Sequence, residues 1–263
     1  MIERYTEINS KAIDKWVENG WEWGIPVSGE VIAEAKNGKW DVLLTPTKPV
    51  PHNWFFPYLI TERLDGVQLL GLASGGGQQM PVFSALGANC TVLDYSEKQL
   101  ESERLVAERE GYVINIVKAD MTKRLPFSDD IFDIIFHPVS NCYIEDVYPL
   151  WNECYRVLMK GGILLSGLDN GFTFLIDDFT ARPLIITNKL PYNPIKNPEQ
   201  MEHSLKAADG SIQFSHSFDE QIGGQLNAGF VITAAYEDYN NDPDAINDGI
   251  PSFWATSAVK MQI

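Results

Sequence analysis

Residues 67–79 read VQLLGLASGGGQQ, and the rest of the chain is organised around this stretch. A mainly apolar run over 67–72 leads into glycines at 75–77, and a segment that can form a helix follows. This order predicts a strand, a tight turn and a helix N-terminus. Glycine accepts a positive φ, and the first N–H groups of a helix favour an anion. We therefore expect a small anionic or zwitterionic ligand here, while a turn that only reverses the chain would have the same glycines.

After residue 67 short apolar runs alternate with helical patterns, which is typical of β-α-β units and a parallel sheet. The alternation predicts strands at 67–72, 90–95, 112–118, 132–137 and 161–168. It predicts helices at 77–87, 97–110 and 146–159. A last helix is expected to end near Gly229, with strands following at 230–238 and 253–261. The pattern is that of a doubly wound α/β fold.

The N-terminal part, residues 1–58, differs from the rest in composition. A helical pattern covers about 10–18, and its tryptophans favour a helix anchored on the core over a substrate-facing aromatic wall. Residues 25–58 are rich in proline, which argues against regular helix or central strand. We expect residues 1–58 to form an ordered arm that covers the site.

A second irregular segment, residues 170–215, interrupts the main domain, which we place at 59–263. Long irregular stretches inside a compact domain usually cover a site. We expect 170–215 to form an insert or lid before the last helix.

The composition excludes several classes of function. The chain has 263 residues, 44% of them hydrophobic, and a net charge of −16. An acidic surface argues against DNA or long RNA as a partner, because nucleic-acid affinity depends on Lys and Arg. There is no apolar run of 18 residues for a membrane span, and the N-terminus lacks the pattern of a secretory signal, so we expect a cytoplasmic protein. The three cysteines have no spacing typical of a zinc site, and no metal is expected; Cys90 should lie in the core.

Three polar residues follow successive predicted strands. Asp94 ends the second strand, Asp120 follows the third, and Asn141 follows the fourth. Ligand sites of open parallel sheets lie at the carboxyl ends of the strands. We therefore expect these side chains to hold a single ligand.

The order of motifs resembles that of a known family. The motifs are Gly71-x-Ala73-x-Gly75, VLDYS at 92–96, KADM at 118–121 with LPFSDDIFDIIF at 125–136, and YRVLMKGGILL at 155–165. Together they resemble the class I S-adenosylmethionine-dependent methyltransferases, of the Rossmann-like methyltransferase superfamily, over about residues 67–168. The resemblance implies a mostly parallel seven-stranded sheet with an antiparallel terminal strand, and S-adenosylmethionine as the cofactor.

In this family the first turn passes beneath the methionine part of the cofactor. The resemblance carries this role to Gly71, Ala73, Gly75, Gly76 and Gly77. The chain departs from the family at Leu69, where an acid is common, and at Ala73, where a glycine is common. We expect the side-chain amides of Gln78 and Gln79 to supply the contact to the amino end of the cofactor that the missing acid would make.

The remaining cofactor contacts follow from the later motifs. By resemblance Asp94 accepts from the two ribose hydroxyls, since a carboxylate offers two acceptors to a vicinal diol, and Tyr95 lines the adenosine. Asp120 accepts from the adenine amino group, and Met121 packs on the base. Without a ligand, Asp94 would be an acid at a helix N-terminus and Asp120 a turn acid.

Residues after the fourth strand are expected near the sulfonium and the substrate. The resemblance places Pro138 and Asn141 there, and it nominates His137 as a general base for a protonated acceptor. A hydrogen-bonded core histidine is the alternative for His137. We expect Cys142 and Tyr143 to serve in packing and not in the chemistry.

The predicted reaction is in-line transfer of a methyl group, in which the protein mainly orients the reactants and excludes water. A small molecule is the expected acceptor. One alternative is an NAD-dependent oxidoreductase, since Gly71-x-Ala73-x-x-Gly76 is one glycine short of the dinucleotide fingerprint. The other is a non-catalytic cofactor-binding protein of the same fold. The sequence does not indicate an oligomeric state.

Overall fold

A sheet of seven strands organises the computed structural model, which describes residues 4–181, 183–207, 210–240 and 249–261. The sheet has the order β3-β2-β1-β4-β5-β7-β6. Its strands are β1 Gln68–Leu72, β2 Asn89–Asp94, β3 Asn115–Lys118, β4 Phe132–His137, β5 Leu158–Asp169, β6 Phe230–Asp238 and β7 Phe253–Lys260. Residues 1–3 of the predicted arm, and 182 and 208–209 of the predicted insert, lie outside the described residues.

The pairing of the strands confirms the predicted fold class. β1 pairs in parallel with β2 and β4, β2 with β3, and β4 with β5. β7 runs antiparallel to both β5 and β6. The carboxyl ends of β1 to β5 therefore meet at one edge of the sheet, which is where a ligand site is expected.

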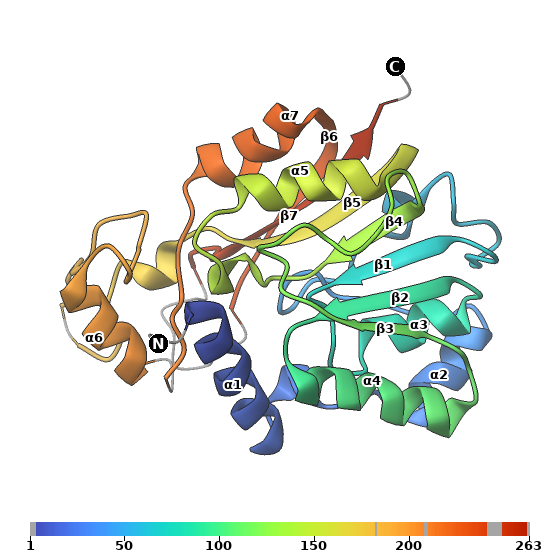
Figure 1. Ribbon diagram of the computed structural model, residues 1–263, viewed down its shortest axis with the longest axis horizontal. Coiled ribbons are helices and arrows are strands. Elements are labelled where there is room, and N and C mark those ends of the chain that lie inside the picture. The colour runs from blue at the N-terminus through green and yellow to red at the C-terminus, as the bar shows by residue number, and fades with distance from the viewer. Residues whose placement is uncertain (1–3, 182, 208–209, 241–248, 262–263) are drawn as a thin grey trace.

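Helices cover both faces of the sheet (Figure 1). α3 Gln79–Ala85 and α4 Glu97–Glu110 lie on one face together with α2 Gly29–Lys36, whereas α5 Tyr148–Val157 and α7 Gly224–Ala228 lie on the other. Each face has its own apolar core, one around Phe83 and Phe136 and the other around Trp151 and Leu164. Burial of these side chains holds the layers together.

The boundaries of α4 show how the sequence fixes an element. The Ser96 hydroxyl accepts from the backbone N–H of Gln99 at 3.1 Å, which satisfies one of the unpaired donors of the first turn. Gly111 ends the helix with a φ of 72°, a left-handed conformation that suits glycine. The helix occupies the predicted range, and its first turn faces the ends of β1 and β2.

Several predicted bounds differ from the structure. The helix predicted at 77–87 begins at Gln79, because Gly77 has a φ of 69° that no α-helix accommodates. The strand predicted at 112–118 begins only at Asn115, and the strand predicted at 161–168 extends over Leu158–Asp169. The helix predicted at 146–159 spans Tyr148–Val157.

The N-terminal arm is more regular than its prolines indicated. α1 Tyr5–Glu18 begins well before the predicted residue 10. The expectation of no regular helix in 25–58 was wrong for α2, because the chain has no proline between 26 and 46 and the Ser28 hydroxyl caps the helix. The arm also belongs to the core, since Trp40, Leu44 and Phe55 are buried in the cluster beneath the sheet.

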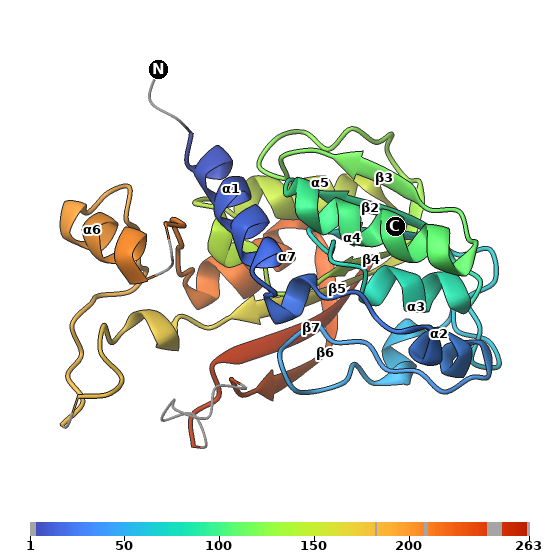
Figure 2. The same cartoon turned by 90° about the horizontal axis from the view of Figure 1, so that it is seen from below.

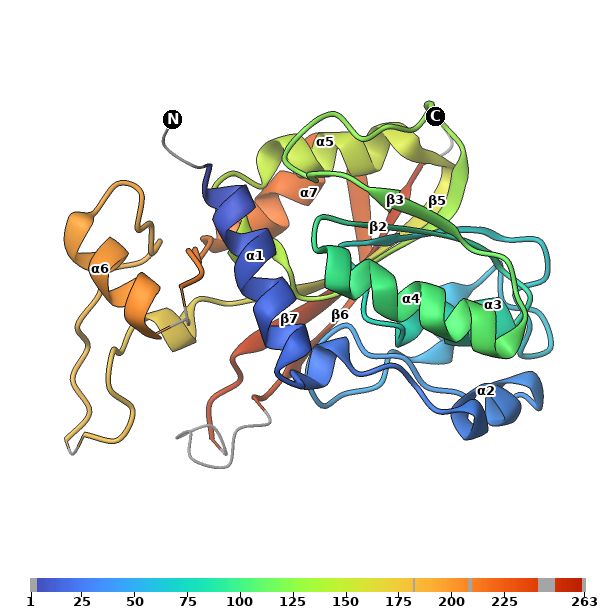
Figure 3. The same ribbon diagram turned by 60° about the horizontal axis from the view of Figure 1, so that its bottom comes forward.

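The insert carries short helices where the sequence indicated irregular structure. η4 Phe172–Phe174 follows β5, and α6 Pro198–Ala207 begins at a proline, which is tolerated in the first turn of a helix. α1 lies between α6 and α4, as Figures 2 and 3 show. Within the described residues no helix is long and apolar enough to cross a membrane.

Candidate active site

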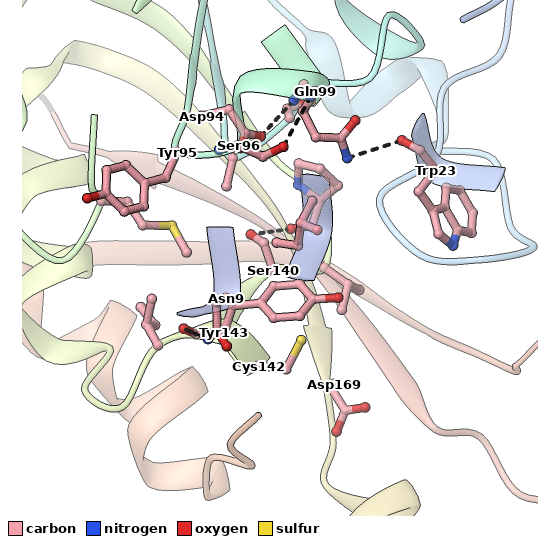
Figure 4. A pocket seen from close by; sticks show the side chains of 18 of the residues that line it. Asn9, Trp23, Asp94, Tyr95, Ser96, Gln99, Ser140, Cys142, Tyr143 and Asp169 are labelled. Carbon is pink, nitrogen blue, oxygen red and sulfur yellow. Dashed lines mark hydrogen bonds between the residues drawn. The ribbon is translucent and has the colours of Figure 1, made fainter. Parts of the chain in front are cut away.

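A cavity of about 750 Å³ opens at the carboxyl ends of the strands. Figure 4 shows side chains that line it, from the arm, the strand ends and η3 Asn141–Tyr143. The predicted site residues that line it are Ala73, Gly75, Gln78, Gln79, Asp94, Tyr95, Asp120, Met121 and Pro138. The predicted site residues that do not line it are Gly71, Gly76, Gly77, His137 and Asn141. The structure therefore brings most of the predicted set together.

The glycine turn faces the cavity at Ala73 and Gly75, and the other glycines pack behind it. A Cβ on Gly75 would lie 2.7 Å from Cβ of Gln99 and 3.1 Å from an oxygen of Asp94, so only glycine fits. The N–H of Gly76 donates to the carbonyl of Gln99 at 2.9 Å. The N–H of Gly77 donates to Glu103 Oε1 at 2.8 Å. These two N–H groups face α4 and not the cavity.

Glu103 is a fully buried carboxyl group beneath this turn. Its Oε1 accepts from Gly77, and its Oε2 has no hydrogen-bond partner. Burial raises the pKa of Glu103 to about 8. The turn is thus held from below by an acid that keeps its proton at neutral pH.

Asp94 is a buried carboxylate at the end of β2. Its oxygens accept from the backbone N–H groups of Gly75, at 3.1 Å, and Ser96, at 2.9 Å. Burial raises the pKa of this carboxyl, and the two N–H groups oppose the rise by stabilising its charge. Because each oxygen has further lone pairs, Asp94 can accept from a ligand as well.

Asp120 lies after β3, with one carboxylate oxygen hydrogen-bonded and the other without a partner. Its Oδ1 accepts from the N–H and the hydroxyl of Thr122, at 2.9 and 2.7 Å. Its Oδ2 is buried without a hydrogen-bond partner. Met121 and Tyr95 line the cavity beside it. An acceptor in an apolar surround is suited to a donor group such as an amine of a heterocycle.

The amides of Gln78 and Gln79 hold the arm, although we expected them to replace the missing acid. Gln78 Nε2 donates to the carbonyls of Glu22, at 2.6 Å, and Ile25, at 3.1 Å. Gln79 Oε1 accepts from the N–H of Leu43 at 3.1 Å. Both side chains touch the cavity but use these polar atoms to fasten residues 22–43.

His137 is a core histidine and not a base in the cavity, so the nomination from the sequence was wrong. The ring is fully buried, and burial lowers its pKa. Its two nitrogens lie 2.9 Å from the carbonyl of Leu72 and 2.8 Å from Oδ1 of Asn141. The Asn141 amide in turn donates to Gln221 Oε1 at 2.9 Å. Both side chains are therefore occupied behind the cavity wall, whereas Pro138 lies in it.

Several cavity residues were not predicted. From the arm and η3 come Thr6, Asn9, Trp21, Trp23, Leu44, Cys142 and Tyr143, and from the insert Thr173, Phe174 and Gln213. The expectation that the tryptophans only anchor α1 was wrong for Trp21 and Trp23. Cys142 and Tyr143 also contact the cavity, which their reading as packing residues did not anticipate. Cys90 lies in the core as expected.

Asp169, at the end of β5, is a buried carboxylate of the cavity, like Asp94. Sequence reasoning predicted Asp94 but missed Asp169. Its Oδ1 accepts from the N–H of Gly171 at 2.6 Å and its Oδ2 from the hydroxyl of Thr173 at 3.2 Å. Burial raises the pKa of this carboxyl to about 6. The rule that selected Asp94, an acid at the end of a parallel strand, would also have selected Asp169.

Among the described residues no cluster of three or more His, Cys, Asp or Glu side chains is arranged to hold a metal ion.

Comparisons with known proteins agree with this geometry. A family described as a methyltransferase domain matches residues 70–166. The uncharacterized methyltransferase YbaJ of Bacillus subtilis is 44% identical over 256 residues, 96% of this chain and 97% of that protein. The sterol 24-C-methyltransferase erg6 of Aspergillus fumigatus is 28% identical over 69% of this chain and 44% of its own length. The ubiquinone biosynthesis O-methyltransferase of Mesorhizobium japonicum is 25% identical over 56% of this chain and 61% of its own length.

A solved structure shares the fold. The S-adenosylmethionine-dependent methyltransferase of Mesorhizobium loti superposes with a TM-score of 0.62 at 22% identity, over 79% of this chain and 94% of that one. The relatives named above are methyltransferases, which decides against the NAD-dependent oxidoreductase and the non-catalytic protein. With 44% identity to YbaJ over nearly the full length of both chains, this protein belongs to the class I S-adenosylmethionine-dependent methyltransferases.

Proposed function

We propose that the protein transfers a methyl group to a small molecule that binds between the arm and the insert. The observation that carries the proposal is a cavity that is lined by the carboxyl groups of Asp94 and Asp120 at the ends of β2 and β3 and has walls from both covering segments. We name its two parts by residues. The cofactor end comprises Ala73, Gly75, Asp94, Tyr95, Asp120 and Met121, and the acceptor end comprises Asn9, Leu44, Tyr143, Asp169 and Phe174.

The residues of the cofactor end fit S-adenosylmethionine. Buried oxygens without a protein partner occur at Ser74 Oγ, Gln99 Oε1 and Asp120 Oδ2, all on cavity-lining residues. Unpartnered buried polar atoms are costly, and ligand groups would satisfy them. In this proposal Asp94 accepts from the ribose hydroxyls and Asp120 from the adenine amino group, while the glycine at 75 leaves room for the methionine part.

Bound S-adenosylmethionine supplies a methyl group already activated on a sulfonium. The chain therefore needs to orient the acceptor and keep water out, which is catalysis by proximity. Trp21, Trp23 and Leu44 of the arm and Phe174 of the insert give the cavity apolar walls suited to that task.

The arm and the insert are, in this proposal, the two covers of the site. Gln78, Gln79 and Gln99 fasten the arm to the glycine turn and to α4 through side-chain hydrogen bonds. Asn9 of α1 joins the insert, donating to the carbonyl of Ile212 at 2.8 Å and accepting from its N–H at 2.7 Å. α1 thus connects both covers.

Three observations support a small molecule as the acceptor. The cavity volume of about 750 Å³ is that of a small-molecule site. The net charge of −16 disfavours nucleic acid. The names of relatives include a sterol and a ubiquinone-pathway methyltransferase.

The free thiols of Cys90, Cys142 and Cys154 are consistent with a protein that acts in the reducing cytoplasm.

Methyl transfer from labelled S-adenosylmethionine to a metabolite extract tests the proposal. We expect label in the small-molecule fraction, and none with the Asp94→Ala variant. A calorimetric titration with S-adenosylhomocysteine is the matched binding measurement. Label found only in protein or nucleic acid would contradict the small-molecule acceptor, and intact binding without any transfer would contradict catalysis on such extracts.

A further inference from the structure

The acceptor end of the cavity holds a carboxylate with no opposite charge beside it. Asp169 is 7% exposed and lines the cavity. Its protein partners are the N–H of Gly171 and the hydroxyl of Thr173, both neutral donors. Buried charges in proteins are normally paired, because desolvation is costly. A cationic group on a ligand would supply the missing charge.

The rest of the cavity wall has the same sign of charge. The ionisable carboxyl groups among its described residues are Glu22, Asp94, Asp120 and Asp169, and no Lys, Arg or His is among them. The protein wall offers no cationic side chain to a carboxylate or phosphate on the acceptor. The charge of the protein wall therefore favours a cationic acceptor over an anionic one.

Asp169 is far from the carboxylate assigned to the ribose. β5 stands three positions from β2 in the sheet order, so at about 4.8 Å per strand their ends are roughly 14 Å apart. Figure 4 shows Asp169 at the opposite side of the drawn site from Asp94, with Tyr143 and Cys142 between them. If Asp94 and Asp120 hold the cofactor, Asp169 remains for the acceptor.

We infer that Asp169 binds the ammonium group of a small-molecule amine and removes its proton. This inference rests on the proposed function for the identity of the cofactor end. An N–H bond of the ammonium breaks, an O–H bond forms on the Asp169 carboxylate, and the electron pair of the broken bond stays on nitrogen as the nucleophile. The carboxyl returns the proton to water once the product has left.

The surroundings of Asp169 agree with this role. Tyr143 and Phe174 give the acceptor end aromatic walls, and Phe253 also lines the cavity, so the amine should carry an apolar body. The titratable groups that face Asp169 are Cys142 and Tyr143, and burial raises the pKa of both, so they stay neutral near pH 7. A carboxyl with a pKa of about 6 is ionised at neutral pH and still basic enough to take a proton.

Binding of matched ligands tests the inference without relying on activity. The probes are benzylamine, 2-phenylethylamine and hexylamine, each compared with the alcohol and the carboxylate of the same skeleton. They are titrated by calorimetry into the protein with and without S-adenosylhomocysteine. We expect at least one amine to bind. The affinity of the matching alcohol should be at least about ten-fold lower than that of the amine, and the carboxylates should not bind.

Two variants and a control localise the effect. Asp169→Asn should weaken amine binding by about 10- to 100-fold while leaving the affinity for S-adenosylhomocysteine unchanged. Asp177→Asn, on the insert but outside the cavity, should change neither. Thr173→Val keeps the charge but removes a donor that lowers the pKa of Asp169, so the pH of half-maximal amine affinity should move upward from about 6.

The outcomes separate this inference from the proposed function. Amines that bind no better than alcohols, no binding of any amine, or full amine binding by Asp169→Asn would each overturn the role of Asp169. Equal loss of amine and S-adenosylhomocysteine affinity in Asp169→Asn would instead place this carboxylate in the cofactor end. Failure of the wild-type protein to bind S-adenosylhomocysteine contradicts the proposed function alone, because the amine titrations without cofactor still decide the inference.

Discussion

The two ends of the cavity are built in different ways. At the cofactor end each polar side chain stands within two residues of a strand, as Asp94 and Asp120 do after β2 and β3, and takes its hydrogen bonds from nearby backbone. The acceptor end is assembled from segments far apart in sequence, such as Asn9 and Ile212, which are 203 residues apart. One end is therefore a local property of the sheet, whereas the other depends on how the two covers dock. Substitutions should therefore impair ligand binding at one end of the cavity while leaving binding at the other end intact.

The largest expected effect is at the cofactor end. Asp94→Ala removes two acceptors for the ribose hydroxyls, and hydrogen bonds to a charged group contribute about 1.5–3 kcal/mol each, so affinity for S-adenosylmethionine should fall at least about 100-fold. Calorimetry measures the affinity, and Glu97→Gln, which changes a partly exposed acid in the first turn of α4 that does not line the cavity, is the control. The acceptor end should still bind its ligand. A loss of less than ten-fold would contradict the assigned role of Asp94.

A substitution on β5 should damage the acceptor end and spare the cofactor end. A Cβ on Gly167 would overlap the backbone carbonyl of Leu44 and lie 2.9 Å from the backbone nitrogen of Val139. Gly167→Ala must therefore push the arm off the sheet, breaking the bond from Val139 N–H to Leu44 O and exposing the Leu44 side chain. We expect a loss of about 2–4 kcal/mol in the free energy of unfolding in urea.

The matched control for this prediction is Gly249→Ala, where an added Cβ meets nothing within 4 Å. Binding of S-adenosylhomocysteine should persist in Gly167→Ala under conditions where it stays folded, while methyl transfer falls. Equal stability of the two variants would show that the arm does not rest on β5 as described.

The same difference explains what the sequence could predict. The mostly parallel sheet, and the places of Asp94, Tyr95, Asp120 and Met121 at the strand ends, could be predicted because strand, turn and side chain are adjacent in the chain. The contact of the Gln78 amide with the arm could not be predicted, because its partner, the carbonyl of Glu22, lies 56 residues away and carries no local signal.

His137 was misassigned for a related reason. Its position at the end of β4 is that of a site residue, but its two ring nitrogens lie against the carbonyl of Leu72 and Oδ1 of Asn141, away from the cavity. Both covering segments were expected, but the individual side chains of the acceptor end could not be predicted, because no pattern indicates which residues of the arm and the insert meet at the cavity. Asp169 alone had a readable signal, its place at the end of a parallel strand.

Glu103, which lies beneath the glycine turn, should make the free energy of unfolding depend on pH. The pKa of Glu103 is about 8 in the folded protein against an ordinary value of 4.5, so the folded state holds a proton that the unfolded state releases. Stability from this group is full below about pH 4.5 and is lost as the pH rises to about 8, at no more than about 1.4 kcal/mol per pH unit.

Glu103→Gln removes this titration and keeps an oxygen to accept from Gly77. Urea unfolding at several pH values between 5 and 9 measures the difference between the variant and the wild type. We expect the variant to gain stability relative to the wild type as the pH rises. A constant difference across the range would contradict a protonated Glu103 beneath the turn.

The smallest expected effect concerns Ala73, which stands where the family commonly has a glycine. Its φ is 47°, and the left-handed region costs an L-residue about 1–2 kcal/mol. Glycine at this position avoids that strain, but folding costs it about 0.5–1 kcal/mol more backbone entropy than alanine. Ala73→Gly should therefore raise the free energy of unfolding by about 0.5–1 kcal/mol. Thr61, with a φ of 48° in an exposed turn outside the cavity, offers the control Thr61→Gly.

The pair of variants distinguishes backbone strain from contact with the cofactor. Strain is relieved in both, so both should be stabilised in urea by similar amounts. Only Ala73→Gly removes a methyl group from the cavity wall, and only it should change the affinity for S-adenosylhomocysteine. If the two variants bind equally well, the Ala73 methyl group makes no contact that matters, and the cofactor end is defined by the carboxylates and Gly75 alone.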